Sequence, residues 1–74
     1  MMLYRCKVDA SVWKGNDGED IYERVGIAKE GDTILVIKRD ESSGYFNVMM
    51  SDGTVGWTSE VFILNKRHFE PVQG

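Results

Sequence analysis

The sequence predicts an all-β fold, a small antiparallel barrel of five to six strands with one short 3₁₀ turn. Three observations support this: the chain has only 74 residues, its apolar runs are short and rich in β-branched and aromatic residues, and Gly-containing polar stretches separate them. A chain of this length buries roughly 60% of its unfolded surface, which leaves room for one core. We therefore expect one domain over residues 1–64 and a tail over 65–74 that is partly ordered at most.

The first half carries the weaker strand signals. Residues 3–8 alternate imperfectly between polar and apolar, and residues 11–13 extend the run, so we expect one strand with a possible break at Asp9-Ala10. Residues 15–20 are acidic and contain Gly, which is typical of a loop, and residues 21–27 return as an irregular strand. A helix in this returning segment is the alternative, but it would be shorter than the ~12 to 15 residues that a lone helix needs.

The second half carries the clearest signals. Residues 33–37 are dense in β-branched side chains and predict a strand, and residues 38–44 contain no apolar residue and predict a loop. Residues 45–51 predict the next strand. Asp52-Gly53 follows directly and is a strong hairpin signal, so residues 54–58 should pair back on that strand.

The end of the chain is expected to close the barrel and then fray. Residues 59–61 are too few for a normal helix and predict the 3₁₀ turn, and residues 62–64 predict a short closing strand. In the tail we expect at least the end to be frayed. The alternation of apolar residues predicts that the core is lined by Ile34, Val36, Val48 and Val55.

Several short segments occur in an order that is typical of one fold family. They are Val25-Gly26, Lys29-Glu30-Gly31-Asp32, Ile34 with Val36, Tyr45-Phe46-Asn47-Val48, Asp52-Gly53, Gly56-Trp57 and Val61-Phe62-Ile63. Together they resemble a Src-homology-3-like domain, and the likeness is closest to the bacterial branch. The resemblance implies a tight turn at Gly31 and a sharp bend or close backbone approach at Gly56.

The resemblance also implies a peptide-binding groove, which is our alternative prediction for function. Tyr45 falls where the family usually carries its groove Trp, and Trp57 and Phe62 would complete the groove for a basic or proline-containing segment. However, Ser59 replaces the expected Pro, and Phe62 lacks the hydroxyl of the family's Tyr. The acidic residues that would pair with a basic ligand residue, or would simply be solvated, are Asp17, Glu19 and Asp20.

The leading prediction places binding on the outer face of the sheet. If Ile34 and Val36 point inward, Leu35 points outward, and Tyr45 and Met49 share that outer face, where Trp13 could join them. A contiguous exposed apolar patch usually marks an interface. The alternative is that the first 24 residues and the tail cover this face.

We therefore predict a non-enzymatic protein-interaction or structural module whose partner is a protein or peptide, with a homo-oligomer as one form. The only Cys and the only His, Cys6 and His68, cannot form a zinc cage alone, and we expect neither a cofactor nor a metal. The net charge of −3 disfavours nucleic-acid binding. No apolar run approaches the ~20 residues that span a bilayer, so we expect a cytoplasmic chain without a membrane partner.

Overall fold

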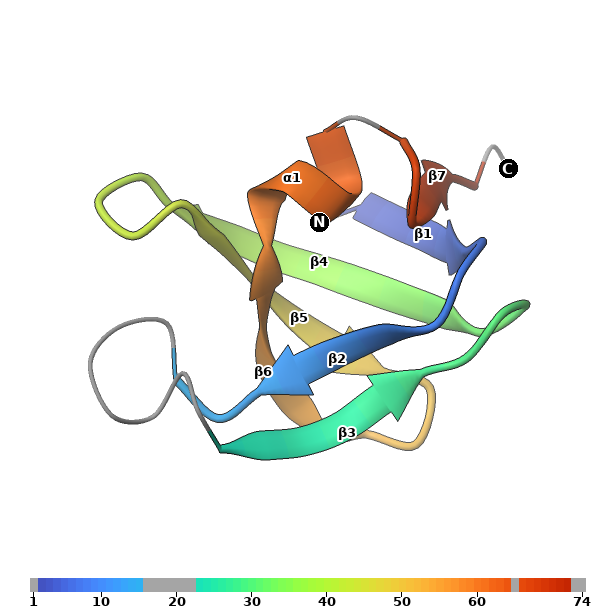
Figure 1. The fold of residues 1–74 in the computed structure, drawn as a ribbon, viewed down its shortest axis with the longest axis horizontal. Helices are drawn as coiled ribbons and strands as arrows, with labels where there is room; N and C mark the ends of the chain where they lie inside the picture. The colour runs from blue at the N-terminus through green and yellow to red at the C-terminus, as the bar shows by residue number, and fades with distance from the viewer. Residues whose placement is uncertain (1, 16–22, 65, 73–74) are drawn as a thin grey trace.

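The computed structural model describes residues 2–15, 23–64 and 66–72. The described part of the chain is all-β, as predicted, and contains one short helix (Figure 1). The elements are β1 (Met2–Cys6), β2 (Ala10–Trp13), β3 (Arg24–Ala28), β4 (Thr33–Asp40), β5 (Tyr45–Met50), β6 (Val55–Ser59), α1 (Glu60–Leu64) and β7 (Phe69–Pro71).

The described residues form seven strands, all in one antiparallel sheet with the order β3-β2-β6-β5-β4-β1-β7. The predicted number of five to six strands is therefore wrong. The expected first strand is divided at residues 7–9, and the tail contributes a strand of its own. The described strands form an open sheet whose edges are β3 and β7, so the closure that a complete barrel requires is not present in these pairings.

The sheet curls around a core to which β1 to β5, α1 and β7 contribute apolar side chains. Ile34, Val36 and Val48 are buried, as the alternation predicted. The buried polar residue Thr58 directs its hydroxyl to the carbonyl oxygen of Ser11, 3.4 Å away. The other apolar residues of the core are Cys6, Ala10, Val12, Ala28, Phe46, Ile63 and Phe69.

The prediction that Val55 lines the core is wrong, because 51% of this residue is exposed. A two-residue turn at Asp52-Gly53 would pair Met50 with Val55 and direct both inward. Instead, the N–H of Met50 bonds to the carbonyl of Thr54, which leaves three residues in the turn, and Met49 pairs with Val55. A shift of one residue moves every side chain of a strand to the other face.

Gly56 faces the interior at a close approach of β2 to β6. A Cβ at this position would lie 2.6 Å from the Trp13 carbonyl oxygen and 2.6 Å from Val12 Cγ1. The absence of a side chain therefore allows β2 to cross over β6, where Trp13 pairs with Trp57. This contact agrees with the close backbone approach that was expected at Gly56.

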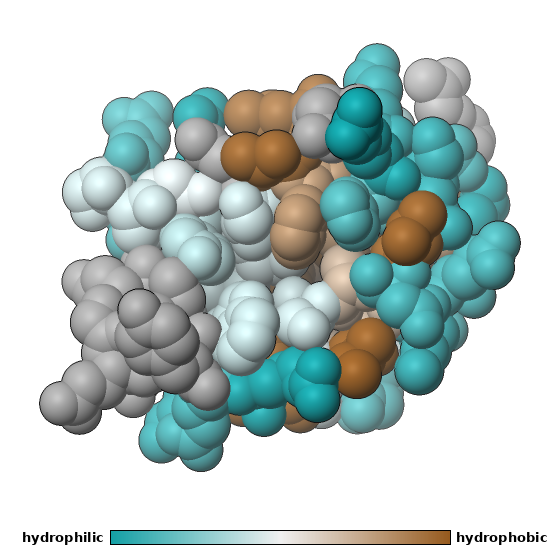
Figure 2. Space-filling model, in the orientation of Figure 1, coloured by the Kyte–Doolittle hydropathy of each residue, from teal (hydrophilic) through white to brown (hydrophobic). Residues whose placement is uncertain are grey.

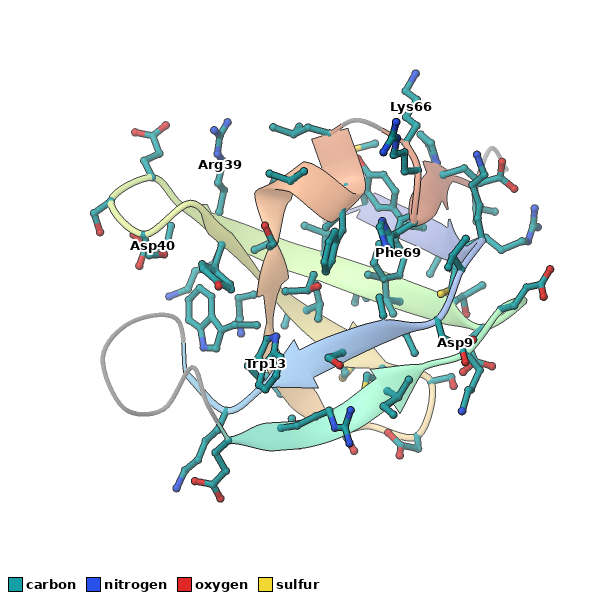
Figure 3. All side chains as sticks on the ribbon, in the orientation of Figure 1. Asp9, Trp13, Arg39, Asp40, Lys66 and Phe69 are labelled. Atoms are coloured by element: carbon teal, nitrogen blue, oxygen red, sulfur yellow. The ribbon has the colours of Figure 1, made fainter. Side chains whose placement is uncertain are left out.

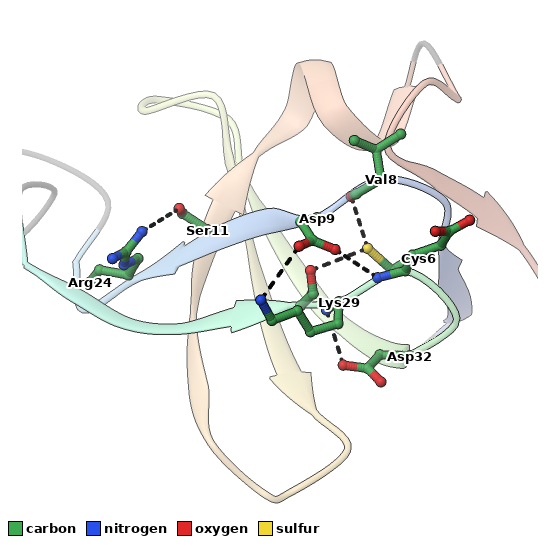
Figure 4. A network of polar contacts seen from close by, with 9 residues as sticks. Cys6, Val8, Asp9, Ser11, Arg24, Lys29 and Asp32 are labelled. Atoms are coloured by element: carbon green, nitrogen blue, oxygen red, sulfur yellow. Dashed lines mark hydrogen bonds and ion pairs between the residues drawn. The ribbon is translucent and has the colours of Figure 1, made fainter.

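The turn before β4 is fixed by two carboxylates and by the buried thiol of Cys6 (Figure 4). Asp9 accepts a hydrogen bond from the backbone N–H of Glu30 at 2.9 Å, and Asp32 accepts one from the N–H of Lys29 at 3.0 Å. Cys6 Sγ lies 3.4 Å from the carbonyl oxygen of Ala28, at the end of β3 before this turn, and 3.0 Å from that of Val8. Gly31 adopts a φ of 93°, as a tight turn at this position requires.

The end of the chain differs most from its prediction. Residues 60–64 form a one-turn α-helix, not a 3₁₀ turn followed by a strand, and Ile63 of this helix is buried. The closing strand is β7, in the segment that was expected to be a partly ordered tail. It pairs with β1, and its Phe69 is fully buried (Figure 3).

Candidate interaction surface

Four apolar side chains form a row across the outer face of the sheet. Leu3 of β1 pairs with Leu35 of β4, Leu35 pairs with Met49 of β5, and Met49 pairs with Val55 of β6. Directly opposed residues of antiparallel strands share a face, and their Cβ atoms lie about 4.5 to 5.5 Å apart. Leu3 is 42%, Met49 36% and Val55 51% exposed, and Leu35 is half-buried. We call these four residues the outer row.

A second row lies beside the outer row on the same face. Lys38 pairs with Asn47, Asn47 pairs with Trp57, and Trp57 pairs with Trp13 of β2. Both tryptophans are half-buried, so part of each indole remains accessible. Lys38 Nζ lies 5.9 Å from the centroid of the Trp57 ring, within the range of a cation–π contact. The Trp pair and Lys38 therefore extend the outer row with an aromatic and a basic group.

An open hollow of about 460 Å³ borders this second row. It lies between Trp57 and the loop that joins β4 to β5, close to the labelled Arg39 and Asp40 in Figure 3. The residues that line it are Lys38, Arg39, Asp40, Glu41, Ser42 and Trp57.

The β4–β5 loop is fixed by its own hydrogen bonds. The carboxylate of Asp40 accepts bonds from the backbone N–H of Ser42 at 3.0 Å and from its hydroxyl at 2.7 Å. The bond from the Ser42 hydroxyl is the main cause of a pKa of Asp40 below its ordinary value. β4 extends to Asp40, three residues beyond its predicted end, and a register shift at Ile37 accommodates this extension.

The structure brings together the residues predicted for the outer face, and of the three residues predicted for the groove only Phe62 lies apart. Tyr45, Met49, Trp57 and Trp13 share one face of neighbouring strands. Phe62 does not join them, because it packs against the core and stacks on His68 with ring centroids 4.0 Å apart. The acidic residues predicted for the first loop, Asp17, Glu19 and Asp20, lie outside the described residues.

Sequence reasoning missed Leu3, Val55 and Lys38 as members of this surface. Leu3 joins it only because β1 pairs with β4, a contact between distant segments that alternation within one strand does not reveal. Val55 was assigned to the wrong face through the turn length. Lys38 was expected in a loop, although its place after a β-branched run was a signal that the strand continues.

The Cys6 thiol is buried and forms no disulfide. Burial raises the pKa of the Cys6 thiol, which favours the protonated form over the reactive thiolate. Within residues 2–15, 23–64 and 66–72 there is no group of three or more His, Cys, Asp or Glu side chains arranged to hold a metal ion. The helix found among these residues has one turn, and none is long and apolar enough to cross a bilayer.

Exposed apolar side chains also occur on α1. Figure 2 shows hydrophobic side chains gathered over this helix, where Val61 is 57% and Leu64 55% exposed. Both residues belong to one helical turn and form no row across neighbouring strands. A substitution at either position therefore tests the effect of exposure alone, without a change to the outer row.

Comparison of the chain with protein-family models, with curated proteins and with solved structures finds no match in any of the three.

Proposed function

We propose that this protein is a non-enzymatic protein-interaction module that binds its partner through the outer row and the adjacent Trp pair. The observation that carries the proposal is the alignment of Leu3, Leu35, Met49 and Val55 on four neighbouring strands of the solvent side. Single exposed apolar residues are common on soluble proteins, but contiguous ones usually mark an interface. The sheet holds these side chains together, so a partner meets a preformed surface.

The size of this surface favours a short segment of another protein as its partner. Neighbouring strands are about 4.8 Å apart and successive outward residues about 7 Å apart, so two rows cover roughly 200 to 300 Å². A standard interface buries about 800 Å² on each partner. The surface is therefore small for a stable homodimer, but it suits one strand or one helical face of a partner.

We also propose a Src-homology-3-like architecture for the fold. The meander β4–β5–β6, the one-turn helix after it and the return of the last strand to β1 support this proposal. The close approach at Gly56 is consistent with the resemblance at Gly56-Trp57. The open edges at β3 and β7 distinguish the described sheet from a fully closed barrel.

The proposed function is tested by photo-crosslinking from within the outer row. A photoreactive benzoyl-phenylalanine in place of Met49 should form adducts with a partner in cells of the source organism. Val55→Lys in the same chain should reduce these adducts at least about fivefold, because a charge would lie beside the crosslinker within the contact. Adduct intensity is measured by blotting, and the partner is then purified and titrated with the wild-type chain.

Val61→Lys is the matched control, because Val61 is exposed to a similar degree but lies on α1. This substitution should leave the adducts unchanged. Equal losses from both substitutions, or adducts that survive Val55→Lys, would contradict binding through the outer row. Adducts of only twice the chain's mass would instead identify a second copy as the partner.

A further inference from the structure

The hollow beside Trp57 offers one basic group next to an aromatic surface. Lys38 is exposed, and its ammonium lies over the Trp57 ring. Among the residues that the structure describes, no ion pair joins Lys38 to a carboxylate, whereas Arg5, Lys14 and Lys29 are each 3.5 Å from one. The Lys38 charge therefore faces the hollow without an acidic partner from the described part of the chain.

The other charged groups around the hollow are arranged differently. The Asp40 carboxylate is turned into its own loop by two hydrogen bonds from Ser42. Arg39 also lines the hollow, and its guanidinium carbon lies 5.8 Å from the centroid of the Phe46 ring. Glu41 lies in the loop beyond the end of β4. The lining of the hollow therefore carries both signs of charge, and the charged group that lies at Trp57 is the Lys38 ammonium.

We infer that the hollow binds the side-chain carboxylate of a Glu or Asp in the partner segment, with a neighbouring apolar or aromatic residue of that segment packed against Trp57 and Trp13. The inference rests on the proposed function and names the chemistry of the partner. The carboxylate would pair with Lys38, and the apolar neighbour would continue toward Met49 and Val55 along the sheet. A basic ligand residue, which the family resemblance implies, would instead place like charges together.

Two peptides that differ only in charge test this inference. Acetyl-Leu-Glu-Phe-amide and acetyl-Leu-Gln-Phe-amide have nearly the same shape, and binding of each is followed by NMR shifts of the Trp57 indole N–H. The Glu peptide should bind about two- to fivefold more tightly at low salt, as expected for an exposed ion pair. Salt at about 0.5 M should remove this preference, because it screens exposed charges.

Lys38→Met keeps the aliphatic chain over Trp57 and removes the charge, so this variant should bind both peptides equally. Lys66→Met is the matched control, because Lys66 is an exposed lysine after α1. This variant should still bind the Glu peptide more tightly than the Gln peptide. Equal binding of the two peptides to the wild-type chain would overturn the inference. So would a preference that survives Lys38→Met, or the absence of Trp57 shifts with both peptides.

A third peptide with Lys in the central position distinguishes a site for an acidic ligand residue from a site for a basic one. Weaker binding of this peptide than of the Gln peptide supports the inference, and tighter binding overturns it in favour of a basic ligand. None of these results depends on the crosslinks from position 49. If crosslinking identifies a partner and the peptides show no charge preference, only the inference about the hollow fails.

Discussion

Gly56 allows β2 to lie close to β6, so replacing it with a larger residue should lower the free energy of unfolding. Gly56→Ala should destabilise the fold by about 1 to 3 kcal/mol, because the new methyl group would overlap the Trp13 backbone oxygen and Val12. The backbone oxygen cannot move without displacing β2. The change in the free energy of unfolding is measured by urea denaturation, with circular dichroism as the signal.

Gly26→Ala provides the matched control for this prediction. A Cβ at Gly26 would meet Met50 Sδ at 3.0 Å and Met50 Cε at 3.3 Å. These atoms are the far end of a flexible side chain that adapts to irregular space. The Gly26→Ala loss should therefore be clearly smaller, and equal losses for the two variants would contradict a specific role for Gly56 in the strand crossing.

Side-chain direction could be predicted where the strand period alone determines it. Ile34, Val36 and Val48 lie inside as alternation requires, and Met49 lies outside. Val55 could not be placed in this way, because its direction depends on whether the preceding turn has two or three residues. Both turns are compatible with Asp52-Gly53, and a difference of one residue reverses the face.

At the scale of elements, β7 is required for the core although it has only three residues. Phe69 is fully buried and packs in the same cluster as Ile34 and Ile63. A chain that ends at Leu64 would lack this side chain and the pairing with β1. We expect it to be unfolded, because a domain of this size has only a few kcal/mol of stability to lose.

This prediction is checked by proton–nitrogen NMR spectra of shortened chains. The chain that ends at Leu64 should give poorly dispersed signals, whereas one that ends at Val72 should keep the dispersion of the full chain. Phe69→Ala in the full chain should cost about 3 to 5 kcal/mol. A well-dispersed spectrum from the chain ending at Leu64 would show that residues 1–64 form a domain without β7.

Strands were predictable from sequence where local signals agreed. The β4–β5–β6 meander has β-branched runs, a polar loop and a Gly-containing turn, and its strands lie close to their predicted positions. β7 was missed because one buried aromatic residue followed by Glu70 and Pro71 gives no periodic signal. Residues 62–64 were assigned to a strand because a short apolar run is compatible with a strand or with one buried helical turn.

For the whole molecule, stability should fall in acid because carboxylates fix three turns. Backbone or side-chain hydrogen bonds lower the pKa of Asp9, Asp40 and Asp52. Each folded-state pKa then lies below the unfolded value of about 3.9. The stabilisation is full above that unfolded value and is lost as the pH falls through the folded-state pKa.

Replacement of all three by Asn keeps a side-chain oxygen as acceptor but removes the charge. The triple variant should be less stable than the wild type near neutral pH, and the difference should shrink as the pH falls below about 4. Urea midpoints measured across the acid range report the difference. Parallel curves for the two proteins would contradict the role of these carboxylates.

The candidate surface could be predicted only in part, because it combines the first two strands of the chain with the β4–β5–β6 meander. Tyr45 and Met49 were placed correctly on the outer face by the period of one strand. The contribution of β1 depends on Leu3 pairing with Leu35, and that of β2 on Trp13 pairing with Trp57. Such pairings depend on the whole topology, which local patterns do not encode. The hollow depends in addition on the three extra residues of β4.

The pairing of β1 with β7 has a consequence for how this domain can be joined to other chains. The N–H of Val72 bonds to the carbonyl of Leu3 at 2.9 Å, so the first and last described residues of the chain lie close together. Adjacent ends allow a domain to be inserted into a surface loop of a host protein, or to be circularly permuted through a short linker. In either arrangement the outer face of β5 and β6, on separate strands, would remain available to a partner.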